Sequence, residues 1–194
     1  HATLVTTAPL TPLDVLVEPS QTNLQLQRRS LGELHAQNHL LVKRGRRINP
    51  ADASPDGTVR VMPTERFGAI ALDPFDAELK YPRATRTEPG DVIFVEKPRP
   101  RAWVDPAGGA MVASPARILR LRESAEVGPT LLATVINETT TPGSEWPMWS
   151  VPVMSRDEVR RLETALLAVE EYEREALRRA TAARDLKTAL IDGV

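Results

Sequence analysis

Two short segments of this sequence each gather positive charge within five residues. The first segment contains Lys43, Arg44, Arg46 and Arg47. The second contains Lys97, Arg99 and Arg101 and is followed by Trp103. An arginine side chain can bind phosphate, or donate two hydrogen bonds to O6 and N7 of a guanine in the major groove. A tryptophan nearby can stack on a base or wedge between bases. Because the net charge of the chain is only −1, these two loops concentrate positive potential locally, and they predict contacts with double-stranded DNA. The alternative for each loop is a solvated turn, with Trp103 in the core.

A second pattern of charged residues suits metal-dependent hydrolysis of DNA. Asp56, Glu78 and Lys80 loosely match nucleases in which two carboxylates bind Mg²⁺ and a lysine positions the attacking water. Asp56 is already accounted for by an Asp-Gly turn with Gly57. A Mg²⁺-dependent nuclease is therefore kept as an alternative only.

Other patterns of catalytic residues are weaker still. His35 and His39 lie four residues apart without a third ligand, so we expect them to be solvated or packed. Asp73-Pro74-Phe75 matches part of a motif of adenine methyltransferases but lacks its second proline, and we expect a turn there. No glycines are spaced as G-x-G, and no G-x-S-x-G motif occurs. We therefore expect no catalytic residue, no metal ion and no cofactor.

The composition limits the classes of protein to which the chain can belong. With 194 residues, of which 41% are hydrophobic, it can bury one globular core and carry an appendage. The absence of cysteine excludes disulfide bonds and thiolate metal sites, and fits the cytoplasm. No apolar run is long enough to cross a membrane. The first residue is not methionine, so we expect a trimmed start rather than a signal peptide, and a chain that is a fragment.

The last forty residues predict one long helix, to which the rest of the chain is attached as a globular domain. Ser155 and Glu158 have the spacing of a capping box, and residues 156–191 contain neither proline nor glycine. Such a helix is about 50 Å long, more than a small domain can cover, so we expect its apolar seam to contact a partner helix. The residues expected at that contact are Leu162, Leu166, Val169, Leu177, Ala180 and Ala183.

The charges along this helix suit an antiparallel partner. Glutamates at 170, 171, 173 and 175 precede basic residues at 178, 179, 184 and 187, so a copy running the other way sets acidic against basic side chains. The alternative is pairing within the helix, between Glu170 and Arg174 and between Glu175 and Arg179. Such pairs contribute only about 0.3–0.5 kcal/mol each.

Short strands and few helices are expected before the long helix. Apolar runs predict strands at residues 13–17, 58–62, 70–72, 92–95 and 117–122, one that begins at residue 40, and a last extended piece at 149–154. Ser30 is a candidate helix cap, and Pro129 starts a short helix at 129–137. The fold class predicted is therefore α+β: a globular mixed domain of short strands and few helices at residues 1–154, followed by one long coiled-coil-forming helix at 155–194.

Several motifs, in order along the chain, resemble the target-recognition domain of type I restriction–modification specificity subunits. These are Ser30-Leu31-Gly32-Glu33-Leu34, Arg44-Gly45-Arg46-Arg47-Ile48-Asn49-Pro50-Ala51-Asp52, Asp56-Gly57, Pro89-Gly90-Asp91-Val92-Ile93-Phe94, Gly143 with Trp149-Ser150-Val151-Pro152-Val153, and the helix end Leu186-Lys187-Thr188-Ala189-Leu190-Ile191-Asp192-Gly193. The resemblance covers nearly the whole chain. It implies a bacterial DNA-reading module without catalysis of its own, whose spacer helix sets a distance and docks DNA adenine methyltransferase subunits.

The chain departs from that family in two respects. It has one recognition domain and one spacer helix instead of two of each, and the glutamine expected after the last extended piece is absent from Ser155-Arg156-Asp157-Glu158-Val159. Two arrangements remain open: a half-subunit that homodimerises through residues 156–191, or the C-terminal part of a fused adenine methyltransferase. A coiled-coil adaptor that does not bind DNA is a further alternative.

Overall fold

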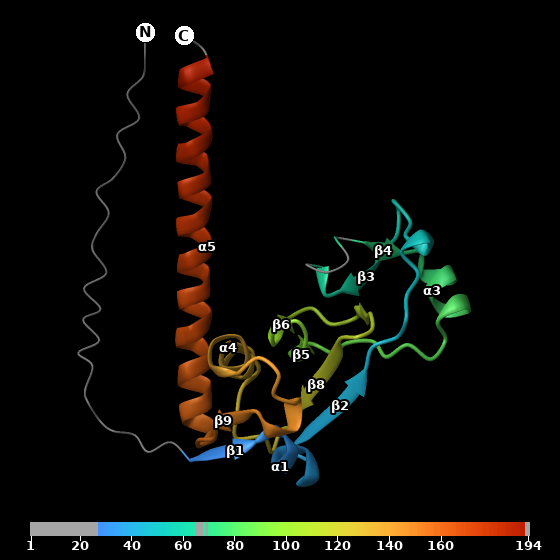
Figure 1. The fold of residues 1–194 in the computed structure, drawn as a ribbon, viewed down its shortest axis with the longest axis vertical. Coiled ribbons are helices and arrows are strands. Elements are labelled where there is room, and N and C mark those ends of the chain that lie inside the picture. The colour runs from blue at the N-terminus through green and yellow to red at the C-terminus, as the bar shows by residue number, and fades with distance from the viewer. Residues whose placement is uncertain (1–26, 65–67, 69, 193–194) are drawn as a thin grey trace, which may run out of the picture.

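A computed structural model describes residues 27–64, 68 and 70–192 of the chain (Figure 1). The strand expected at residues 13–17 lies outside the described residues. The elements follow in the order β1 (Arg28–Ser30), α1 (Leu31–Ala36), β2 (Leu40–Arg44), η1 (Pro50–Asp52), β3 (Val59–Met62), β4 (Ala71–Leu72), α3 (Pro74–Lys80), β5 (Asp91–Val95), β6 (Arg101–Asp105), β7 (Met111–Val112), β8 (Arg117–Leu121), α4 (Pro129–Thr139), η2 (Trp146–Met148), β9 (Ser150–Pro152) and α5 (Arg156–Asp192). The mixture of short strands, few helices and one long C-terminal helix confirms the predicted α+β class.

A four-stranded antiparallel sheet is the centre of the domain. Its strand order is β2-β8-β5-β6, so that β5, which is buried along its whole length, has a neighbour on each side. Alternate side chains of these strands pack on the main core, with α4 lying between the sheet and α5 (Figure 1). The Asn137 side chain of α4 is hydrogen-bonded to both the N–H and the C=O of Ala102 on β6, at 2.8 and 3.0 Å. The edge strand is thereby covered and tied to the helix.

A smaller lobe lies beyond one end of this sheet. It contains the three-stranded sheet β4-β3-β7 and the helix α3, and β2 points toward it (Figure 1). Its own core consists of Ile48, Val61, Leu72, Ala77, Met111 and Ala113. The turn predicted at Asp73-Pro74-Phe75 is instead the start of α3. Asp73 is its N-cap, accepting hydrogen bonds from the amides of Phe75 and Asp76, and Pro74 takes the first helical position, where no N–H is needed.

The two ends of the globular domain meet at the other end of the central sheet. β1 pairs antiparallel with β9, and the amide of Leu31 donates to the carbonyl of Trp149 at 2.9 Å. The predicted cap is confirmed, since Ser30 and Glu33 form a complete capping box at the start of α1. The chain therefore enters and leaves the domain close to the start of α5.

The long helix is confirmed as a rod that its own domain covers only in part. Ser155 and Glu158 exchange the hydrogen bonds of the predicted capping box. Leu162 and Leu166 pack against the main core, whereas from Leu167 onward nearly every described side chain is exposed. Figure 1 shows the C-terminal part of α5 extending well past the described elements of the domain. No helix among the described residues is long and apolar enough to span a membrane.

Candidate nucleic-acid interface

The strand order of the central sheet brings both basic segments to the same end of it. Arg44, the last residue of β2, pairs with Arg117, the first residue of β8, and Arg117 in turn pairs with Phe94 near the end of β5. Val95 of β5 pairs with Arg101, the first residue of β6. Neighbouring strands are about 4.8 Å apart, so the ends of β2 and β5, with β8 between them, are roughly 10 Å apart. We call this region the basic end, defined by Lys43, Arg44, Arg46, Arg47, Lys97, Arg99 and Arg101.

The cations of the basic end are not neutralised by neighbouring carboxylates. None of the seven forms an ion pair with another residue that the structure describes, and all except the half-buried Lys43 are exposed. Elsewhere in the domain Arg60 is paired with Asp105, and Arg120 with Asp91 and Glu88. The basic end therefore carries seven cations whose charge no described carboxylate neutralises, and this creates local positive potential.

The first basic segment is held in place by its backbone. The amide of Arg46 donates to the carbonyl of Val112 at 2.8 Å, and its carbonyl accepts from Ser114 at 2.7 Å. A Cβ atom at Gly45 would lie 2.6 Å from the carbonyl oxygen of Ala116, so glycine is required for this close approach. The backbone of Arg46 is therefore fixed while its side chain stays exposed.

The second basic segment borders a hollow of about 390 Å³. Its lining is Pro63, Val95, Lys97, Pro98, Arg99, Arg101 and Trp103. Arg101 and Trp103 belong to strand β6 rather than to the loop in which the sequence placed them. Trp103 is half-buried and packs against a small core that includes Ile93 and Ile118. One part of its indole is thus used in packing, and the rest faces the hollow.

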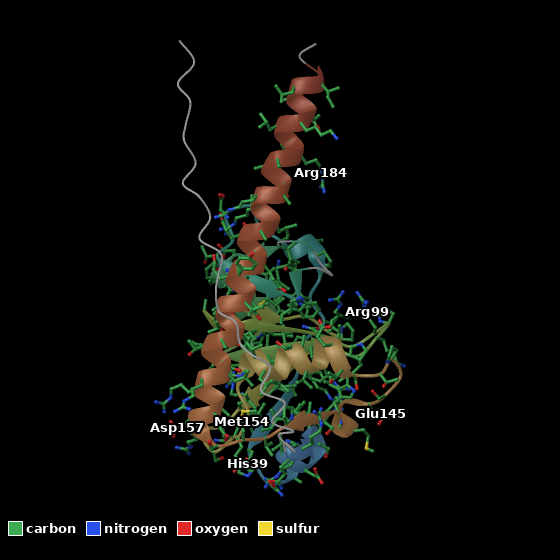
Figure 2. All side chains as sticks on the ribbon, turned by 90° about the vertical axis from the view of Figure 1, so that its left-hand side faces the viewer. His39, Arg99, Glu145, Met154, Asp157 and Arg184 are labelled. Carbon is green, nitrogen blue, oxygen red and sulfur yellow. The ribbon has the colours of Figure 1, made fainter. Side chains whose placement is uncertain are left out.

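A second hollow, of about 350 Å³, lies beside the first and shares Lys97 with it. It is lined by Glu96, Lys97, Arg117 and residues 143–147. Arg117 Nη2 lies 3.5 Å from Glu96 Oε2, and Glu96 Oε1 accepts a hydrogen bond from the amide of Trp146 at 3.0 Å. Figure 2 shows Arg99 and Glu145 on the side of the domain away from Asp157, which marks the start of α5. Arg117 and Glu96 were not predicted as site residues, because only the sheet register brings Arg117 between the two basic segments and beside Glu96.

The alternative metal-binding arrangements receive no support from the contacts of their residues. Lys80 Nζ is bound by Asp52 at 2.9 Å and Asp76 at 3.1 Å, and these hydrogen bonds raise its pKa, so it keeps its proton. Glu78 is paired with Arg86 at 3.0 Å. His39 lies beyond the end of α1, so it does not share a helix with His35. Among the described residues there is no cluster of three or more histidine, aspartate or glutamate side chains that could hold a metal ion.

The residues predicted for the helix contact divide into two groups. Leu162 and Leu166 are partly buried against the chain's own domain, so they are engaged within the molecule. Val169, Leu177, Ala180 and Ala183 are exposed, with 54% of Val169 and 68% of Leu177 accessible. Only the second group is free to meet a partner helix.

Comparison with known proteins finds similarity of fold but not of sequence. No protein-family model matches the chain, and neither does any curated protein. A chain from a structural study of complex assembly and conformational transition of the type I R-M system superposes with a TM-score of 0.54 at 16% identity, over 83% of this chain and 42% of that one. The HsdS subunit from Thermoanaerobacter tengcongensis superposes with a TM-score of 0.50 at 15% identity, over 79% of this chain and 39% of that one.

The chain thus spans about two fifths of the length of the structures that it resembles. At such low identity the likeness concerns the arrangement of the elements and not the side chains. The predicted resemblance is confirmed at that level: the chain has a fold similar to that of type I restriction–modification specificity subunits.

Proposed function

We propose that this chain is a DNA sequence-recognition module of a restriction–modification or DNA adenine methyltransferase system. In this proposal the basic end binds double-stranded DNA and selects the target site. The chemistry is supplied by an adenine methyltransferase, either as a separate subunit or as a domain fused to this one.

The observation that carries this proposal is the position of the unpaired cations. Two segments about fifty residues apart in the sequence meet at one end of the central sheet, and their seven basic side chains have no carboxylate partner among the described residues. Side chains of this kind neutralise phosphates and release counterions, which provides most of the sequence-independent affinity for DNA. The similarity of fold to specificity subunits of type I systems independently supports a role in DNA recognition.

The proposal is tested by titrating a fluorescently labelled duplex with the full chain at low salt. Arg46→Ala combined with Arg99→Ala removes one cation from each segment, and the double variant should bind more weakly. Its slope of log affinity against log salt should be less steep by about two, because each phosphate contact contributes roughly 0.9. The matched control is Arg122→Ala. Arg122 is exposed, has no ion-pair partner among the described residues and follows the opposite end of β8.

Two results would count against this proposal. A wild-type chain that does not bind any duplex at low salt would refute it and would favour the adaptor alternative. A double variant with the same binding curve as Arg122→Ala would show that the DNA contacts another surface.

We also propose that the exposed part of α5 pairs with a second copy of the chain, antiparallel. Within the helix, Glu175 pairs with Arg179 at 3.0 Å, whereas Arg174 pairs with Glu171 and not with Glu170 as the intrahelical alternative predicted. On the part of the rod beyond Leu167, five charged side chains have no ion-pair partner among the described residues: Glu170, Glu173, Arg184, Asp185 and Lys187. A copy running the other way would bring acidic side chains opposite basic ones and would cover the exposed apolar residues.

A further inference from the structure

The ion pair of Arg117 and Glu96 lies between the two basic segments. Arg117 begins β8, the strand that separates β2 from β5, so one basic segment emerges on each side of it. Its side chain is 28% exposed and that of Glu96 is 25% exposed, whereas the arginines of the basic end are exposed. A half-buried, ion-paired arginine between exposed, unpaired cations differs from them in what it can recognise.

We propose that Arg117 reads a guanine in the major groove of the bound DNA, and that Glu96 positions it. This inference rests on the proposed function, since it assumes that DNA lies against the basic end. It assigns different tasks to the two kinds of arginine. The exposed, unpaired ones contact phosphates, which carry no sequence information, and the ion-paired one provides discrimination between bases.

The free donors of Arg117 are the first argument for this assignment. A guanidinium has five N–H donors. Arg120, three residues along the same strand, uses Nε, Nη1 and Nη2 on Asp91, Glu88 and the carbonyl of Arg86. Arg117 has one polar contact, the ion pair of 3.5 Å between its Nη2 and Oε2 of Glu96, and it donates no hydrogen bond to any residue that the structure describes. Arg120 is thus saturated by the fold, whereas Arg117 keeps donors for O6 and N7 of guanine.

The way in which Glu96 is held is the second argument. Its Oε1 is bound by the amide of Trp146, so the carboxylate itself has a defined position, and its Oε2 then restrains the guanidinium. Preorganisation of this kind reduces the entropy lost when the arginine binds a base edge. The adjoining hollow of about 350 Å³ provides space in front of the pair.

The test is selection of duplexes from a random library by the full chain, followed by sequencing. The wild type should select a site that contains a guanine at a fixed position. Arg117→Lys should reduce the preference for that base pair by about tenfold or more, because lysine cannot make the bidentate contact. Its affinity for unselected duplexes should not change, since lysine keeps the charge. Glu96→Gln should weaken the same preference, because the amide oxygen still accepts from Trp146 but the charge that orients Arg117 is lost.

Arg29→Lys is the matched control. Arg29 is also 28% exposed and lies 3.9 Å from a glutamate, Glu126, but it belongs to β1 at the far end of the domain. Its substitution should leave the selected site unchanged. Thermal unfolding of all three variants shows whether each is folded.

The outcomes separate this inference from the proposed function. If the wild type selects a site and Arg117→Lys selects the same site with equal preference, the inference is wrong while the proposed function stands. A uniform loss of affinity for all duplexes would equally refute it, because Arg117 would then be a phosphate contact. Should Arg117→Lys fail to fold, an unchanged guanine preference in Glu96→Gln refutes the inference. A wild type that binds no DNA refutes both.

Discussion

The carboxylate of Glu163 on α5 accepts a hydrogen bond of 2.7 Å from the backbone amide of Leu131 in the first turn of α4. Its other oxygen accepts from the amide of Thr130 at 3.0 Å. The N-cap residue of α4 is Gly128, which has no side chain with which to cap the helix. A residue of the long helix therefore supplies the missing cap, and its negative charge lies at the positive end of the α4 dipole. This contact helps to set the direction in which α5 leaves the domain.

Replacement of Glu163 should loosen the long helix from the domain. Glu163→Ala leaves two amides of α4 without their acceptor, and we expect the free energy of unfolding to fall by about 1–2 kcal/mol. Urea denaturation followed by circular dichroism measures this. Glu173→Ala, on the exposed part of the same helix, is the control and should change the stability by less than about 0.5 kcal/mol. Equal effects of the two substitutions would show that Glu163 is not a cap.

The effect of replacing Gly128 on stability should depend on the side chain of Glu163. A Cβ atom at residue 128 would lie 2.3 Å from the carboxylate of Glu163, so Gly128→Ala must displace that side chain. We expect Gly128→Ala to destabilise the wild type but to have a smaller effect in the Glu163→Ala background. A double-mutant cycle should give a coupling of at least about 0.5 kcal/mol, and additivity would contradict the proposed contact.

Arg120 should be essential for the stability of the central sheet. It is paired with Asp91, whose side chain is only 2% exposed, so Arg120→Met removes the positive charge beside a buried carboxylate and leaves it the hydrogen bond from the amide of Glu88. We expect a loss of about 3–5 kcal/mol in the free energy of unfolding. Arg122→Met, two residues further and exposed, should have little effect in the same denaturation experiment. A loss below 1 kcal/mol for Arg120→Met would mean that Asp91 finds another partner.

Acid should weaken the connection between the central sheet and the small lobe through Asp105. Burial raises the pKa of this carboxyl, but hydrogen bonds from Thr87 and Arg60 outweigh burial and leave the pKa below its ordinary value of 3.8. Because the pKa is lower in the folded state, the stabilisation is complete above about pH 4 and is lost as the pH falls through the folded-state pKa. Asp105→Asn should be less stable than the wild type at pH 7, and the difference should shrink as the pH is lowered from 4 toward 2. Thermal melting over this range measures it, and a constant difference would argue against the linkage.

Self-association should depend on one face of α5. Ala180→Asp places a carboxylate on the proposed seam, and we expect self-association to weaken by at least about tenfold, because a buried unpaired charge is costly. Thr181→Asp is the matched control, because it introduces the same charge one residue further and about 100° around the helix. Sedimentation equilibrium gives the association constants. Monomeric wild type, or equal loss in both variants, would exclude this seam as the dimer contact.

The features that could be predicted from the sequence are those that depend on neighbouring residues. The capping boxes at Ser30 and Ser155 and the length of α5 are local, since their hydrogen bonds join residues three or four apart. The apolar run of β5 likewise identified the central strand. The turn predicted at Asp73 was wrong, because a turn and a helix cap use the same residue types. Only the packing of Ala77 in the small lobe decides between them.

The sequence by itself determined that two clusters of cations exist and that a long rod follows them. Whether the clusters lie close together was decided by the tertiary structure, because the strand between them, β8, comes from residues 117–121, which follow both segments. The same holds for Arg117 and Arg120. Both are arginines of one strand, but only the packing around that strand saturates one side chain with carboxylates and leaves the other with donors to spare. The physical reason is that hydrogen bonds between distant segments depend on sheet order and register, which no short window of sequence contains.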